Sequence, residues 1–103
     1  EIARFQTRAL KVGLCAGRHS IPGVSQYIFP ENFFSESCDM FNFGRMASRV
    51  EKTLSGVKNI ILYVTGYTPA LIAVVKYCSD HGISIVCRHY NRDTGLYVTQ
   101  EVL

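Results

Sequence analysis

Apolar and polar residues along the 103-residue chain change repeatedly between continuous or alternating runs and stretches with helical spacing. Such changes predict strands and helices in succession. The apolar run at residues 59–64 ends at Thr65 and Gly66, and an apolar stretch with helical spacing begins at Pro69. We therefore predict a buried strand, a tight turn with a positive φ at Gly66, and a helix that begins at Pro69 with Thr68 as its N-cap.

Four more extended segments carry β-branched or alternating apolar residues, namely 10–16, 25–29, 83–90 and 96–102. The segment 25–29 stops at Pro30, so it is either an edge strand or an ordered connection. The last segment is predicted to pair antiparallel with 83–90 across a turn. Before the central strand, a helix is predicted to begin between Asp39 and Asn42 and to end near Gly56. Its expected apolar face consists of Phe43, Met46, Ala47, Val50 and Leu54.

This order of elements predicts an α/β protein in a single domain over residues 1–103. The expected architecture is a small three-layer Rossmann-like domain, with a mainly parallel sheet, a C-terminal antiparallel hairpin strand and two main helices. Right-handed crossovers would make the strands at 10–16, 59–64 and 83–90 parallel. Their carboxyl ends would then share one edge of the sheet, which is where open α/β sheets bind ligands.

Polar residues lie at or just beyond the carboxyl ends of these three strands, and we predict that they converge on a ligand. The candidate binding residues are Arg18, Thr65, Gly66, Tyr67, Thr68, Arg88, Tyr90 and Arg92. Backbone N–H groups of Ala70 and Leu71 at the predicted helix start, with the positive end of the helix dipole, suit a phosphate. The favoured ligand is therefore a nucleotide or a short RNA, with a tyrosine stacked on a base.

A sharper hypothesis adds metal-free cleavage of an RNA phosphodiester. His19 and His89 are the candidate general acid and base, because histidine titrates near neutral pH. Each candidate also has a structural interpretation. A Thr-Pro pair caps many helices that bind nothing, histidines hydrogen-bond loops, and Arg88 and Arg92 can pair with nearby carboxylates.

The composition and charge of the chain bear on which partners are expected. The chain is 48% hydrophobic and carries a formal charge of +3, which favours anionic partners only slightly. Arg45, Arg49 and Lys52 form a basic flank on the first predicted helix, open to solvent or to an anionic partner. Residues 1–5 do not form a secretory signal, and no apolar run has the length of a membrane span, so no membrane partner is expected.

The four cysteines are Cys15, Cys38, Cys78 and Cys87, and none forms a Cys-x-x-Cys pair. We expect Cys15, Cys78 and Cys87 to be buried thiols, which favours a reducing, cytoplasmic location. A zinc site is disfavoured by the spacing, and a dehydrogenase is disfavoured because residues 13–17 do not match G-x-G-x-x-G. No metal or cofactor is therefore expected.

The segment 64–71, Val-Thr-Gly-Tyr-Thr-Pro-Ala-Leu, resembles the strand-Thr-Gly-helix element of CARF domains, which sense cyclic oligonucleotides in CRISPR-linked defence. It also resembles the same element of ring nucleases built on that fold. The usual second glycine, followed by threonine and lysine, is replaced by Tyr67, Thr68 and Pro69. The resemblance implies a homodimer that holds the ligand between its subunits, and a face formed by Ala70, Ala73 and Tyr77 suits that association.

A contrasting hypothesis is a non-enzymatic interaction protein, acting as a homodimer, a subunit or an inhibitor. Five phenylalanines lie in or near the acidic segment 31–39: Phe29, Phe33, Phe34, Phe41 and Phe43. Aromatic side chains are frequent anchors of protein interfaces, although they also fill cores.

Overall fold

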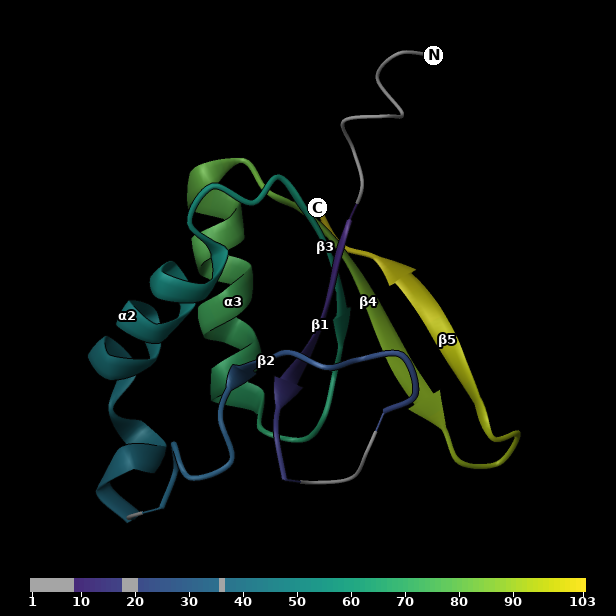
Figure 1. The fold of residues 1–103 in the computed structure, drawn as a ribbon, viewed down its shortest axis with the longest axis horizontal. Helices are drawn as coiled ribbons and strands as arrows, with labels where there is room; N and C mark the ends of the chain where they lie inside the picture. The colour runs from purple at the N-terminus through teal and green to yellow at the C-terminus, as the bar shows by residue number, and fades with distance from the viewer. Residues whose placement is uncertain (1–8, 18–20, 36) are drawn as a thin grey trace.

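The computed structural model of the protein describes residues 9–17, 21–35 and 37–103. The elements follow in the order β1 (Leu10–Cys15), β2 (Tyr27–Phe29), the 3₁₀ helix η1 (Ser37–Phe41), α2 (Phe43–Leu54), β3 (Asn59–Tyr63), α3 (Thr68–His81), β4 (Ser84–Asn91) and β5 (Leu96–Glu101) (Figure 1). Within the described residues, no helix is both long enough and apolar enough to cross a bilayer.

The five strands form one sheet in the order β2-β1-β3-β4-β5. The first four pair in parallel, and β5 pairs antiparallel with β4. The predicted α/β class, the mainly parallel sheet, the C-terminal antiparallel strand and the two main helices are thus confirmed. The uncertain segment 25–29 contains a real edge strand that ends before Pro30. The carboxyl ends of β1, β3 and β4 share one edge, as their parallel pairing requires (Figure 1).

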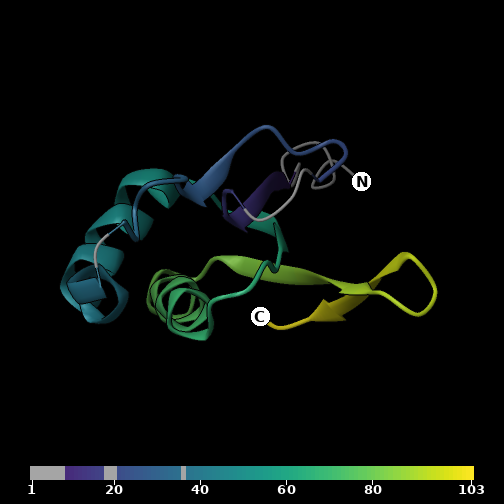
Figure 2. The same ribbon diagram turned by 90° about the horizontal axis from the view of Figure 1, so that it is seen from below.

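One detail of the expected architecture differs, because α2 and α3 pack against each other on the same face of the sheet (Figure 2). The described helices therefore give two layers rather than three. From β2 to β3 and from β3 to β4 the chain moves across the sheet in one direction, so right-handed crossovers place both helices on one face. The connection from β1 to β2 moves the other way, and its described residues form turns and bends.

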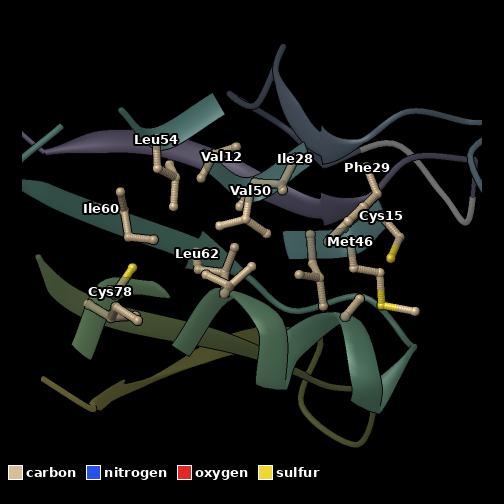
Figure 3. Close-up of a cluster of buried hydrophobic side chains, with 14 of the residues drawn as sticks. Val12, Cys15, Ile28, Phe29, Met46, Val50, Leu54, Ile60, Leu62 and Cys78 are labelled. Atoms are coloured by element: carbon tan, nitrogen blue, oxygen red, sulfur yellow. The ribbon is translucent and has the colours of Figure 1, made fainter. Parts of the chain in front are cut away.

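The core lies between the sheet and the two helices (Figure 3). Alternate residues of the strands and every third or fourth residue of the helices point into it, as their periodicities require. Fully buried examples are Val12, Leu14, Ile28, Ile60, Leu62, Met46, Val50, Leu54, Val74 and Cys78. The covered face of the sheet thus resembles the strands of a buried α/β sheet, with no polar side chain among these positions.

The first long helix, α2, begins where the sequence predicts. The side chain of its N-cap, Asn42, accepts a hydrogen bond of 3.0 Å from the amide of Arg45. Gly56, just beyond the helix, has a φ of +82°, which matches the predicted terminator. The predicted apolar face is partly wrong, because Phe43 and Ala47 are exposed while the other three predicted positions are buried.

Two cations of the basic flank of α2 make contacts within the protein. The Arg45 guanidinium donates to the carbonyl of Phe33 at 2.7 Å, pairs with Asp39 at 3.2 Å, and lies 3.9 Å from the centre of the Phe33 ring. Arg49 Nε donates to the carbonyl of Ile28 at 2.7 Å. Two of the three cations thus tie α2 to the acidic segment and to β2, whereas Lys52 is exposed.

Replacement of Arg49 by alanine should destabilise the fold. A hydrogen bond from a charged donor contributes about 1.5–3 kcal/mol, and its loss leaves the carbonyl of Ile28 without this donor. Lys52→Ala, three residues along the same helix, is the matched control and should change stability by less than about 0.5 kcal/mol. Urea unfolding followed by circular dichroism measures both. Equal stabilities of the two variants would contradict the anchoring role of Arg49.

Candidate ligand site at the carboxyl edge of the sheet

Thr65, two residues after β3, joins the ends of β1 and β3. Its hydroxyl donates a hydrogen bond to the carbonyl of Cys15 at 2.9 Å and accepts one from the Cys15 amide at 3.0 Å. The residue is only 6% exposed. The side chain therefore continues the β1–β3 ladder beyond its last paired residues, Gly13 and Tyr63. Contact of Thr65 with a ligand stays a prediction, because the hydroxyl is engaged with backbone here.

This junction is the topological switch point of the sheet. The chain leaves β1 toward β2, on one side, and leaves β3 toward β4, on the other side. Ligand sites in open α/β sheets form where neighbouring connections diverge in this way, since the divergence opens a crevice at the strand ends. The crevice predicted from the sequence is therefore expected between the carboxyl ends of β1 and β3.

A cavity of about 440 Å³ lies at this edge. Its volume falls within the range of roughly 300–1,000 Å³ that is typical of small-molecule sites. The ends of β1 and β2, the acidic segment, η1 and the turn before α3 all contribute to it. The lining residues are Cys15, Ala16, Gly17, Pro30, Glu31, Phe34, Met40 and Tyr67.

Tyr67 forms a fixed wall of this cavity. Its ring packs edge-to-face on Phe34, with centroids 5.2 Å apart, and its hydroxyl donates a hydrogen bond to the carbonyl of Met40. Phe34 in turn contacts the buried rings of Phe29 and Phe33. These contacts anchor the turn before α3 to the acidic segment. The ring of Tyr67, a predicted stacking residue, is fixed by Phe34 on one side and by the carbonyl of Met40 at its hydroxyl.

The start of α3 differs by one residue from the prediction. Tyr67, with extended backbone angles, is the N-cap in place of Thr68, and no side chain caps the helix. The amide of Leu71 donates to the carbonyl of Tyr67 at 3.2 Å, so the predicted use of this N–H for a phosphate is wrong in this structure. Gly66 has the predicted positive φ, +92°, and is exposed beside the helix start.

Glu31 supplies the charged side chain that lines the cavity within the described part of the chain. Gly17 lies against it, and a Cβ on Gly17 would stand 2.9 Å from Glu31 Cγ. Gly17 also has a φ of +89°, which favours glycine. The sequence analysis missed Glu31 as a site residue. The available signal was an acid placed two residues after a strand that neighbours β1.

Arg18, His19 and Ser20 lie outside the described residues, so their predicted roles in binding and catalysis stay predictions. Arg18 directly follows Gly17, which lines the cavity. The chain therefore leads from the cavity wall into the predicted cation.

The strand predicted at 83–90 is β4, which continues to Asn91, so Arg88, His89 and Tyr90 lie within a paired strand. Its side chains consequently alternate between the faces of the sheet. Arg88 donates to Thr99 Oγ1 at 2.8 Å, whereas His89 Nε2 shares a hydrogen bond of 2.9 Å with Gln100 Oε1 on the opposite face. Arg92 lies exposed in the hairpin turn, at the far side of the sheet from β2 (Figure 1).

The expected convergence of three segments is therefore only partly present. The structure brings the ends of β1 and β2 and the Thr65–Tyr67 turn together, while Arg88, His89, Tyr90 and Arg92 belong to the β4–β5 hairpin. Within the described residues, no group of three potential metal ligands occurs.

Cys15, Cys78 and Cys87 are buried thiols, as predicted. Burial, together with the neighbouring Cys87, raises the pKa of Cys78 to about 11. Burial also raises the pKa of Cys87. Both groups are protonated at neutral pH, and a neutral thiol is a poor nucleophile. The chemistry of the two cysteines is that of small apolar side chains.

A second concavity, of about 430 Å³, is an apolar groove on the outer side of α2 and α3. Ala73 and Tyr77 line it as the predicted association face requires, but Ala70 is fully buried and belongs to the core. Phe43 and Ile72, each 60% exposed, replace Ala70 on this face. The apolar circumference of α3 is thus divided between core and groove.

Comparisons of the chain with protein-family models, with curated proteins and with solved structures give no match. The resemblance of residues 64–71 to CARF domains therefore stays a prediction that rests on those residues.

Thr65→Val should weaken the junction of β1 and β3 with little change in side-chain shape. The variant loses both hydrogen bonds to Cys15, so the free energy of unfolding should fall by about 1–3 kcal/mol. Thr68→Val is the control, because Thr68 is exposed at the start of α3 and caps no helix in this structure. Urea unfolding decides the matter, and a Thr65→Val protein as stable as the control would show that the bridge is dispensable.

Proposed function

We propose that the protein binds a nucleoside phosphate in the cavity at the carboxyl edge of the sheet. This proposal rests on the position of the cavity. The cavity lies at the switch point between β1 and β3, and Tyr67, the N-cap residue of α3, forms part of its wall. The two features favour the same ligand, because crevices at switch points hold nucleotides and helix starts hold phosphates.

The phosphate would lie beside Gly66 and the first turn of α3. A glycine with a positive φ allows close approach to the backbone, and the 14-residue helix directs its positive end toward this turn. Arg18 remains the proposed cation, since it follows Gly17 at the cavity wall. Arginine can donate two parallel hydrogen bonds to phosphate oxygens.

The nucleoside would occupy the rest of the cavity. Phe34 and Tyr67 offer aromatic edges and faces for a base. The Glu31 carboxylate accepts hydrogen bonds, so it suits the hydroxyls of a ribose or the amino group of a base. In nucleotide-binding α/β folds, an acidic residue commonly binds the ribose in this way.

The resemblance to CARF domains widens the proposed ligand class to cyclic oligonucleotides and a role in CRISPR-linked defence, with the ligand shared between two subunits. RNA cleavage by His19 and His89 is a separate proposal, and it requires a ligand that extends from the cavity to His89 in the β4–β5 hairpin. Cleavage in EDTA that disappears in His19→Ala and in His89→Ala would establish it.

Calorimetric titration with adenosine and guanosine phosphates and with cyclic oligonucleotides tests binding. Glu31→Gln and Arg18→Ala should each weaken binding roughly 10- to 100-fold, because each removes a hydrogen bond made by a charged group. Glu51→Gln is the control for charge, since Glu51 is exposed on α2 and does not line the cavity.

Two results would refute this proposal. One is the absence of binding to every nucleotide by the folded wild-type protein. The other is binding that is equally strong in wild type, Glu31→Gln and Arg18→Ala.

A second candidate function, a homodimeric interaction protein, has the apolar groove between α2 and α3 in its favour. Phe43 and Ile72 are well exposed there, and exposed apolar patches are typical of protein interfaces. The other phenylalanines of the acidic segment support it less, because Phe29 and Phe33 are buried.

Light scattering tests this second candidate. An association through the groove should give twice the chain mass of 11.6 kDa, and Ile72→Lys should restore the single-chain mass by placing a charge in the interface. Ser48→Lys, on an exposed part of α2 outside the groove, should leave the dimer intact. A monomeric wild-type protein at high concentration would rule this association out.

A further inference from the structure

The sheet has a second face, which no described helix covers (Figure 2). Strand pairing places Tyr63 between Gly13 and Arg88, and Arg88 between Tyr63 and Thr99, so these residues point to the same side. Tyr27, opposite Gly13, and the pair Tyr90–Tyr97 continue the same face. Four of the six tyrosines of the chain therefore lie on the uncovered face.

Three of these tyrosines are in direct contact. The rings of Tyr63 and Tyr97 have centroids 5.2 Å apart at an interplanar angle of 82°, and those of Tyr90 and Tyr97 are 5.3 Å apart at 61°. Burial raises the pKa of Tyr97, and the phenols of Tyr63, Tyr90 and Tyr27 raise it further. Tyr90 is nevertheless 52% exposed. The cluster thus combines rings held by their neighbours with an accessible ring.

The fourth ring lies directly on the backbone of β1. A Cβ on Gly13 would stand 2.4 Å from two ring atoms of Tyr27, which is closer than any such contact allows. Gly13 therefore gives the Tyr27 ring its place on the sheet. The aromatic cluster, defined here as Tyr27, Tyr63, Tyr90 and Tyr97, extends over four of the five strands. Tyr63 is only 6% exposed and supports the ring of Tyr97 from below.

Positive charge accompanies these rings. The Arg88 guanidinium lies 5.7 Å from the centre of the Tyr63 ring and donates to Thr99. In the described part of the chain, Arg88 forms no ion pair, and its Nε is buried without a hydrogen-bond partner. Lys11 is exposed on the same face, toward the end of the strands away from Tyr90 and Tyr97. The acid Glu101 lies in the same cross-strand row as Lys11, with two strands between them.

The combination of aromatic rings with Arg88 and Lys11 favours a particular class of partner. A sheet face that meets only water is usually polar, and a face covered by helices is usually aliphatic. Tyrosines next to basic residues match neither case. They match the surfaces that bind single-stranded nucleic acids, where aromatic rings stack on unpaired bases and basic groups contact the phosphates.

We propose that the uncovered face binds single-stranded nucleic acid. Tyr90 and Tyr97 stack on unpaired bases, while Lys11 and Arg88 contact the backbone phosphates. This site is distinct from the cavity, because its residues lie along the strands on the uncovered face and in the hairpin, whereas the cavity lies at the carboxyl edge and is lined by other residues. Duplexes should bind weakly, since their bases are already stacked on one another.

Fluorescence anisotropy with a labelled 12-nucleotide RNA strand tests the proposal. Tyr90→Ala should weaken binding roughly 5- to 100-fold, because one stacked base contributes about 1–3 kcal/mol. Tyr90→Phe retains the ring and should bind nearly as well as the wild type. Val98→Ala is the matched control, because Val98 is an exposed residue of β5 on the opposite face from Tyr97.

Salt dependence provides a second measurement. Lys11→Ala should lower the slope of log affinity against log salt concentration by about 0.7, the value for the loss of one phosphate contact on a single strand. Glu31→Gln should leave RNA binding unchanged, because Glu31 lines the cavity on the carboxyl edge. Failure of nucleotide binding in the cavity would therefore leave this proposal standing, and the reverse also holds.

Several results would overturn the proposal. They are equal affinity for duplex and single strand, an unchanged affinity in Tyr90→Ala, or the absence of any binding at low salt by the folded protein. A protein assembly whose mass falls in Tyr90→Ala but not in Ile72→Lys would assign the face to a second copy of the chain instead.

Discussion

The pairing of β1 with β3, closed by the Thr65 hydroxyl, is the interaction on which the rest of the structure depends. It joins residues that are 50 positions apart in the chain and sets the strands between which the sheet connections diverge. Without this junction, the end of β1 would not lie beside the turn that starts α3. The cavity, the anchored Tyr67 ring and the position of the helix dipole all follow from it.

The periodicity of the sequence is enough to predict much of the fold. Apolar runs and helical spacing indicate β1, β3, β4, β5 and both helices, and Gly66 and Gly56 mark turns that do have a positive φ. The number of layers could not be predicted, because it depends on the strand order, which sets the direction of each crossover across the sheet. The buried position of Ala70 could not be predicted either, since α3 is apolar on more than one side.

The site was harder to predict, because the direction of each candidate side chain depends on where the strands end and on how they pair. Arg88, His89 and Tyr90 were expected at the end of a strand and turned toward one pocket, but β5 pairs with β4 as far as Asn91, and this pairing forces their side chains to alternate between the two faces. The basic flank of α2 illustrates the same limit. Arg45 and Arg49 look available in the sequence, yet two backbone carbonyls of distant segments accept their hydrogen bonds.

The one-sided distribution of tyrosines also determines the spectroscopic behaviour of the molecule. The chain contains no tryptophan, so its ultraviolet emission comes from tyrosines. Most of them belong to the uncovered face, and three are in mutual contact there. The intrinsic fluorescence of the unlabelled protein is therefore mainly a property of that surface, and it reports directly when something covers it.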